Sequence, residues 1–129
     1  MIAKNWKEYI GEVKQGYYKI GYITCDALFG EKIIFNKYGF DHLIWKGKKI
    51  RSIDEQAKRL RLFQEVPSIL REAKQFKDYR VVTRISNKTR SLSTARFWSF
   101  TDKNKKIIVV IRQTNNGSKH FFSVMCSGA

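Results

Sequence analysis

The stretch IIVVIRQTNNGSKHFFSVM, residues 107–125, decides the fold that we expect for this chain. Runs rich in β-branched and aromatic residues at 106–114 and 119–125 predict two strands, and an Asn-Gly pair stands between them. Such a pair between two strand-like runs is a strong signal for a β-hairpin. Two earlier runs of the same character, 79–86 and 91–101, precede the hairpin and are joined by short connections. The sequence therefore predicts strands that follow one another as an antiparallel meander.

The register of this hairpin depends on its turn. If the Asn-Gly pair alone forms the turn, Arg112 pairs with Phe121, and Val110 pairs with Ser123. Opposed residues share a face of a sheet, so Arg112 and Ser123 would project to one side and His120 to the other. A longer turn or a bulge would shift the register by one residue and change each of these assignments.

The first part of the chain predicts helices. Residues 3–15 space their apolar side chains as an amphipathic helix does, and Gly16 follows as its end. SIDEQAKRLRLFQEV begins with Ser52 three residues before Glu55, which is the spacing of a capping box at the start of a second helix. Pro67 fits the first turn of a third helix, PSILREAKQF.

The expected fold class is α+β, with N-terminal helices packed on one face of a four-stranded antiparallel meander sheet. A further short strand is a candidate at 31–36, EKIIFN. A chain of 129 residues fits a single domain, residues 1–129, and no linker rich in Pro, Gly or Ser divides it. Within this domain, residues 1–30 are either an N-terminal helical segment or a connector, and residues 31–129 form the core.

The composition is strongly basic. The chain carries 26 Lys and Arg against 11 Asp and Glu, a formal net charge of +15, and residues 78–129 alone hold 10 basic and 2 acidic residues. Hydrophobic residues make up 43% of the sequence, which excludes a disordered polycation. Such an excess of positive charge favours a polyanion as partner, and nucleic acid is the commonest one. A basic membrane-associated or merely soluble protein is the alternative.

Neither a membrane span nor a metal site is predicted. The longest aliphatic run, IIVVI at 107–111, is far too short to cross a bilayer, and the N-terminus lacks an apolar run of signal-peptide length. Cys25 and Cys126 stand far apart in no metal-like spacing, so we expect free thiols in a reducing compartment and no metal or other cofactor. Cytoplasm is the expected site of action, and delivery as part of a larger secreted or phage protein is left open.

Candidate chemistry centres on the two histidines of the chain. His42 lies in GFDHLIWKGKKIR, residues 39–51, directly ahead of the cationic side chains Lys46, Lys48, Lys49 and Arg51, while His120 begins the last predicted strand. RNA cleavage without a metal needs a base for the 2′-hydroxyl, an acid for the leaving 5′-oxygen and cations for the developing charge. Histidine suits both proton transfers because its pKa lies near neutrality, but a lone histidine is also a common surface or structural residue.

RNA binding is expected from cations and aromatic rings together, since unpaired bases stack on aromatic side chains while cations hold the backbone. In ARFWSF, residues 95–100, strand alternation sends Arg96 and Trp98 to one face and Phe97 to the other. One face must pack on the helices, and packing is the commoner fate of a residue such as Trp98. The residues that we single out for RNA binding are Lys46, Lys49, Arg51, Arg96 and Trp98. For each lysine, a solvated loop position is the alternative.

Four segments, FDHLIWKGKKIR, EQAKRLRLF, ARFWSF and IIVVIRQTNNGSKHFFSVM, resemble the phage- and toxin-associated branch of the barnase/EndoU/colicin/RelE-like (BECR) ribonuclease superfamily. The resemblance covers roughly residues 31–126. It implies helices followed by an antiparallel sheet that carries the active site, and metal-independent cleavage of RNA, often of transfer RNA in or near the anticodon loop. By position, it implies a catalytic His42, the helper cations Lys46 and Lys48, and contributions from Arg112, His120 and Ser123.

Together these features predict a metal-independent endoribonuclease toxin that cleaves RNA, in particular tRNA, by attack of the 2′-hydroxyl and leaves a 2′,3′-cyclic phosphate. In this interpretation His42 is the base or the acid and His120 is its counterpart. Arg112 and Lys48 stabilise the phosphate, and Ser123 positions the phosphate or a catalytic group. The expected partners are RNA and an acidic immunity or antitoxin protein. No membrane partner is expected, and the oligomeric state is not predicted.

The same sequence features are compatible with two other functions. One is a non-catalytic basic RNA- or DNA-binding module of a phage or mobile element, and the other is an inert interaction domain of a phage structural protein. At the level of single residues, Arg112 is alternatively a strand-end cation in solvent, and Ser123 a small filler in a tight sheet. A binding module would lose affinity steeply with salt but would keep its effect when either histidine is replaced.

Overall fold

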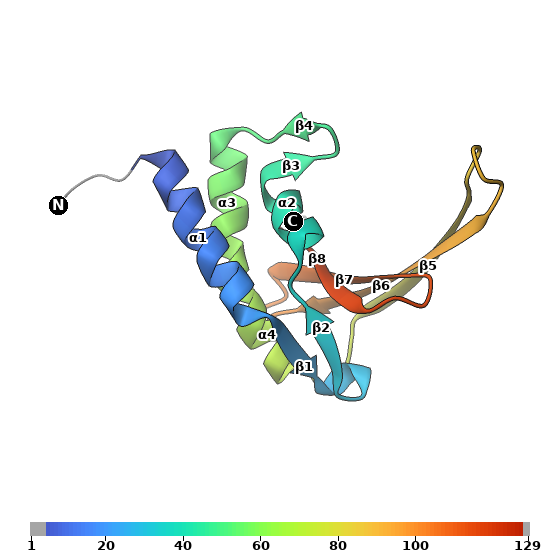
Figure 1. The fold of residues 1–129 in the computed structure, drawn as a ribbon. Helices are drawn as coiled ribbons and strands as arrows, with labels where there is room; N and C mark the ends of the chain where they lie inside the picture. The colour runs from blue at the N-terminus through green and yellow to red at the C-terminus, as the bar shows by residue number, and fades with distance from the viewer. Residues whose placement is uncertain (1–4, 128–129) are drawn as a thin grey trace.

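Residues 5–127 are described by the computed structural model. Its elements, in chain order, are α1 (Trp6–Ile20), β1 (Tyr22–Cys25), the short 3₁₀ helix η1 (Asp26–Leu28), β2 (Glu31–Ile34), α2 (Lys37–Ile44), β3 (Trp45–Lys46), β4 (Lys49–Ile50), α3 (Ile53–Phe63), α4 (Val66–Glu72), β5 (Asp78–Ile85), β6 (Leu92–Thr101), β7 (Ile107–Thr114) and β8 (Lys119–Cys126). The chain is α+β, as the sequence predicts (Figure 1).

The main sheet is larger than the sequence predicts. It has six strands in the order β1-β2-β8-β7-β6-β5, and β3 and β4 form a separate two-stranded sheet. Strands β5 to β8 are the expected antiparallel meander. The prediction of a four-stranded sheet is wrong because β2, the candidate short strand, pairs in parallel with β8, and β1 pairs with β2. The sequence does not predict β1 because its 4 residues give too short an alternation.

The first helix runs past its predicted end. Gly16 lies inside α1, which is capped instead by Gly21 at a φ of 71°. The helix continues because Tyr17, only 1% exposed, packs in the core and offsets the cost of a glycine within a helix. The predicted start at residue 3 lies outside the described residues.

Helices α3 and α4 begin where the sequence places them. The Oγ of Ser52 accepts a hydrogen bond of 3.2 Å from the Glu55 amide, which confirms the capping residue of α3. Pro67 lies in the first turn of α4, as predicted. This helix ends at Glu72, and the predicted extension to Phe76 is wrong because the Phe76 side chain, 39% exposed, lies outside the core.

Helices and sheet share one hydrophobic core. Its centre is a cluster of aromatic rings with centroids 5.2 to 6.2 Å apart, formed by Tyr17, Phe35, Phe63 and Phe121. Residues of α1, β1 and η1 belong to this core as well, namely Tyr17, Ile23, Cys25 and Leu28. The first thirty positions therefore contribute packed structure to the domain over the part of them that is described.

The alternation expected in β6 places Trp98 inside. Trp98 is 8% exposed and Phe100 is 1% exposed, so this face of β6 packs toward the helices. Phe97 points to the opposite face, which the helices leave open. The assignment of Trp98 to RNA stacking is corrected for this reason, since a base cannot reach a ring that is enclosed in the core.

Helix α2 lies beside β8 because β2, which precedes it, pairs with only the first two residues of that strand (Figure 1). The approach is close at Gly39, where a Cβ atom would lie 2.5 Å from both the Phe121 carbonyl oxygen and the Tyr17 hydroxyl. Phe40 and Leu43 of α2 enter the core. The intervening side chain of His42 is left at the border between the helix and the open face of the sheet.

Candidate active site

A hollow of about 210 Å³ forms where α2 meets the open face of the sheet. It is lined by Tyr38, Asp41, His42, Trp45, Gly47, Arg112 and Phe122. The fold therefore brings His42, from the first half of the chain, into one concave site with Arg112 from the terminal hairpin. These are two of the residues that the sequence singles out for catalysis.

His42 is uncharged at neutral pH in this site. Burial lowers the pKa of its imidazole from the ordinary 6.5 to about 4, and the positive charges of Arg51, Arg59 and Arg112 act in the same direction. Its ring lies 4.7 Å from the ring of Phe122, measured between centroids. Nδ1 of His42 is buried without a hydrogen-bond partner, and this burial destabilises the folded state. A neutral imidazole is the form that accepts a proton.

Arg112 is a cation in a fixed position. Its guanidinium carbon lies 4.5 Å from the centroid of the Phe122 ring and 5.9 Å from that of Tyr38. Its Nε donates a hydrogen bond of 3.1 Å to Nε2 of His120. Burial lowers the pKa of Arg112, but a guanidinium still carries its proton at any physiological pH. Arg112 lines the hollow, and a guanidinium there can bind a phosphate group.

The register of the β7–β8 hairpin corrects the predicted placement of His120. Arg112 pairs with His120, not with Phe121, because the turn is longer than two residues, with Gly117 N bonded to Thr114 O at 3.0 Å. The two side chains therefore share a face of the sheet. A bulge next to Val110 then restores the predicted pairing of Val110 with Ser123.

His120 supports Arg112 and does not itself line the hollow. Its side chain is 7% exposed, and burial followed by the charge of Arg112 lowers its pKa. Because Nε2 already accepts from Arg112, this nitrogen is not available to a substrate. His120 thus contacts Arg112 and is not among the residues that line the hollow, and its role as the acid–base counterpart of His42 stays a prediction.

Ser123 is not brought to the hollow. It is 1% exposed, and its Oγ lies 3.4 Å from Nη1 of Arg59 in α3. The same Nη1 donates a 2.7 Å hydrogen bond to the carbonyl of Val124, so Arg59 ties α3 to β8. Ser123 keeps its predicted pairing with Val110, but it is buried against Arg59 and is not among the residues that line the hollow.

The cations after His42 divide into two kinds. Lys46, Lys48 and Lys49 are exposed on the β3–β4 hairpin, whose turn residue Gly47 lines the hollow. Arg51 is 9% exposed, and its Nε donates a 3.1 Å hydrogen bond to the His42 carbonyl. The assignment of Arg51 to RNA binding is therefore corrected to a structural role.

Arg96 lies apart from this group. Its Nη1 donates to the carbonyl of Asn115 at 3.4 Å, and strand alternation places it on the same side of β6 as Trp98. It therefore projects from the opposite face of the sheet to Arg112 and Phe122.

Sequence reasoning misses the residues that shape the hollow, Tyr38, Trp45 and Phe122. The helix that carries Tyr38 had one signal in the sequence, its N-cap residue. Asn36, whose Oδ1 accepts from the Gly39 amide at 3.4 Å, is a favourable N-cap and would have predicted α2. No such signal exists for Phe122, since its direction depends on the turn length and the bulge of the β7–β8 hairpin.

No known protein family, curated protein or solved structure matches this chain. Among residues 5–127, no group of three or more His, Cys, Asp or Glu side chains could hold a metal ion. No helix in that part of the chain is long and apolar enough to span a membrane. The function must therefore be inferred from the site.

Proposed function

We propose that this protein is a metal-independent endoribonuclease whose active site is the hollow between α2 and the sheet. The observation that supports this most directly is the shared location of a neutral His42 and a fixed Arg112. The first group accepts a proton and the second binds a phosphate, which are two of the functions that metal-free RNA cleavage requires.

His42 acts as the base in this proposal. It removes the proton of a 2′-hydroxyl, the 2′-oxygen attacks the adjacent phosphorus, and the bond from phosphorus to the 5′-oxygen breaks, leaving a 2′,3′-cyclic phosphate. A pKa of about 4 makes a free imidazole a weak base. A bound phosphodiester places negative charge against Arg112 and raises the pKa of His42 toward neutrality, so the base gains strength when substrate binds.

The leaving 5′-oxygen needs a proton, and the geometry favours Tyr38 over His120 as its source. Tyr38 is 67% exposed and lines the hollow with its ring 5.9 Å from the Arg112 guanidinium carbon. Its hydroxyl donates the proton to the 5′-oxygen. Arg112 neutralises the charge on the phosphoryl oxygens, and Lys48 adds positive charge from the exposed hairpin.

The superfamily resemblance supports a narrower proposal. It points to tRNA as the substrate, to a toxin that acts in cytoplasm, and to an acidic immunity or antitoxin protein as partner. The net charge of +15 favours both the RNA and the acidic inhibitor.

The decisive experiment compares the purified protein with His42→Gln and Arg112→Ala variants on total cellular RNA in the presence of a chelator. We expect cyclic-phosphate ends with the wild type and at least about a hundredfold slower cleavage with His42→Gln. Lys74→Ala, which removes one exposed charge next to β5, is the matched control and should cleave normally.

A non-catalytic RNA- or DNA-binding module is the second candidate, and the open basic face of the sheet supports it. Wild-type protein that binds RNA tightly but leaves it intact, with His42→Gln binding equally well, would establish the module and exclude the nuclease.

A further inference from the structure

A larger cavity lies on the open face of the sheet, directly beside the hollow. Its volume is about 500 Å³, and it spans β5, β6, β7 and β8. The two cavities share Arg112 and Phe122 as lining residues. We call the larger one the arm groove, since β5 and β6 extend from the body as a curved arm (Figure 1).

Two stacks of a guanidinium on a phenyl ring form the floor of the arm groove. The guanidinium carbon of Arg80 lies 4.8 Å from the ring centroid of Phe97, and that of Arg112 lies 4.5 Å from the ring centroid of Phe122. The two rings are 5.6 Å apart. Both cations and both rings are therefore presented side by side to a ligand in the groove.

The charge of the groove is positive throughout. Arg84 also lines it, and no Asp or Glu is among its lining residues within the described chain. Among residues 5–127, neither Arg80 nor Arg84 makes an ion pair with an acidic side chain. These cations are free to bind an anion.

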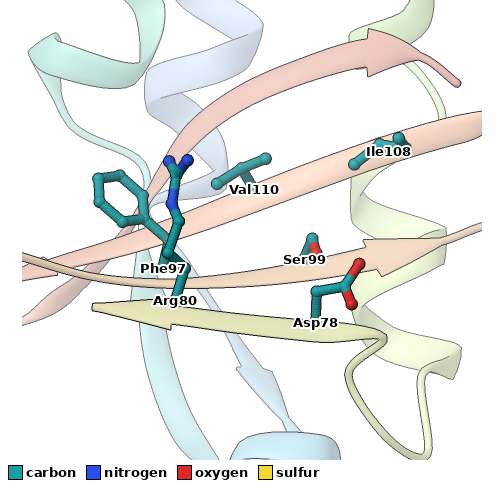
Figure 2. A pocket seen from close by; sticks show the side chains of 6 residues that line it. All are labelled: Asp78, Arg80, Phe97, Ser99, Ile108 and Val110. Carbon is teal, nitrogen blue, oxygen red and sulfur yellow. The ribbon is translucent and has the colours of Figure 1, made fainter. Parts of the chain in front are cut away.

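A third cavity, of about 260 Å³, continues along the same face and shares Arg80 and Phe97 with the arm groove. Figure 2 shows Arg80 beside the ring of Phe97 and reaching toward Val110, with Asp78 at the far end of the cavity. Of the residues that line these two cavities on the sheet, only Asp78 is acidic, and it lies at the end remote from the hollow, so the cationic surface formed by the strands ends before Asp78. The hollow itself also contains one carboxylate, Asp41 of α2.

We propose that the arm groove binds a single-stranded segment of nucleic acid, with a base against the Arg80–Phe97 stack and the backbone along Arg84 and Arg112. Aromatic faces together with cations are the chemistry that binds unpaired bases. A duplex offers no free base face to these rings. Through Arg112 the groove opens into the hollow, so the assignment deepens the proposed function and names unpaired RNA as its substrate.

The test uses a fluorescent oligonucleotide made of 2′-O-methyl nucleotides, which lacks the attacking hydroxyl and cannot be cleaved. Binding is measured by anisotropy for the single strand and for the same strand annealed to its complement. The variants are Phe97→Leu, Arg80→Ala and Arg84→Ala, each checked for folding by urea unfolding. The controls are Phe29→Leu, at a residue 94% exposed beside η1, and Arg61→Ala, at an exposed position in α3.

We expect Phe97→Leu to weaken single-strand binding at least about fivefold. Arg80→Ala and Arg84→Ala should each reduce the slope of log affinity against log salt by about 0.7. The controls should leave both quantities unchanged, and the duplex should bind more weakly than the single strand. Because Arg80 and Arg84 are exposed, we expect their alanine variants to fold, so they still test the proposal if Phe97→Leu fails to fold.

The proposal is overturned if the groove variants bind the single strand as the controls do, or if the duplex binds equally well. Because the probe cannot react, this result is independent of cleavage. If the wild type does not cleave RNA but the groove variants still weaken single-strand binding, the arm groove is confirmed as a binding site and only the proposed nuclease activity is wrong.

Discussion

Arg112 and His120 face each other across β7 and β8, and Nε of Arg112 donates a hydrogen bond of 3.1 Å to Nε2 of His120. A guanidinium only donates, so Nε2 of His120 must be the acceptor and the imidazole proton must sit on Nδ1. The Ser118 backbone is the hydrogen-bond partner that opposes the lowering of the His120 pKa. One buried histidine thus orients the cation of the candidate site.

Replacing His120 separates this positioning role from catalysis by His120 itself. His120→Ala should lower the rate of RNA cleavage about tenfold, because Arg112 loses the hydrogen bond that orients it. His120→Gln should recover most of the rate, since an amide oxygen can accept from the same Nε. Steady-state kinetics of both variants provide the measurement. Equal losses in the two would show that the imidazole has a direct chemical role.

Gly39 allows α2 to lie against β8, so Gly39→Ala should destabilise the fold. The new Cβ would lie 2.5 Å from the Phe121 carbonyl oxygen and from the Tyr17 hydroxyl, and α2 must move to relieve the clash. We expect a loss of about 1–3 kcal/mol in the free energy of unfolding, measured in urea.

Gly16→Ala in α1 is the matched control, because a Cβ there meets nothing within 4 Å. It should raise the free energy of unfolding by about 0.5–1 kcal/mol through helix propensity. A Gly39→Ala protein as stable as Gly16→Ala would mean that α2 does not pack closely on β8.

The strands and the candidate site differ in how far the sequence could predict them. Strands β5 to β8 are long, rich in β-branched residues and separated by short turns, so local pattern is sufficient to locate them. Helix α2 has 8 residues and a glycine in its first turn, and its formation depends on packing against β8. Apart from the Asn36 N-cap, the local pattern therefore gives no signal for a helix there.

The candidate site depends on relationships that no local pattern contains. His42 and Arg112 could be named from residue type, but their meeting requires β2 to pair in parallel with β8 and thereby to place α2. The direction of Phe122 and the pairing of His120 depend on a bulge and on the turn length. Burial of Arg51 and Ser123 follows from the packing of α2 and α3, which the cationic and small residue types do not reveal.

The low pKa of His42 predicts acid sensitivity of the fold. Well above pH 6.5 both the folded and the unfolded chain carry a neutral imidazole, so the titration of His42 does not change stability there. As pH falls from 6.5 toward about 4, the unfolded chain takes up a proton that the folded chain resists, so stability declines. We expect a loss of about 1–2 kcal/mol between pH 7 and pH 5 from urea unfolding.

His42→Gln should reduce the loss of stability between pH 7 and pH 5. His120→Gln should reduce it further, because the pKa of His120 is lowered as well. The range above pH 5 precedes the titration of ordinary carboxylates. Wild-type stability that is constant over this range would contradict the burial of both imidazoles.

Arg51 and Lys48 belong to the same basic stretch, but the structure predicts opposite effects of replacing them. Arg51 is 9% exposed, donates to the His42 carbonyl and lies 4.0 Å from Glu55, so Arg51→Ala should cost about 1–3 kcal/mol in the free energy of unfolding. Lys48 is exposed on the β3–β4 hairpin, and Lys48→Ala should change stability by less than about 0.5 kcal/mol. Its effect should instead be a smaller salt dependence of RNA binding, because one phosphate contact is lost. Urea unfolding measures the stability of both variants, and a salt titration measures the salt dependence of their RNA binding. A destabilised Lys48→Ala protein, or an Arg51→Ala protein of normal stability, would reverse the structural and RNA-binding roles assigned to these two cations.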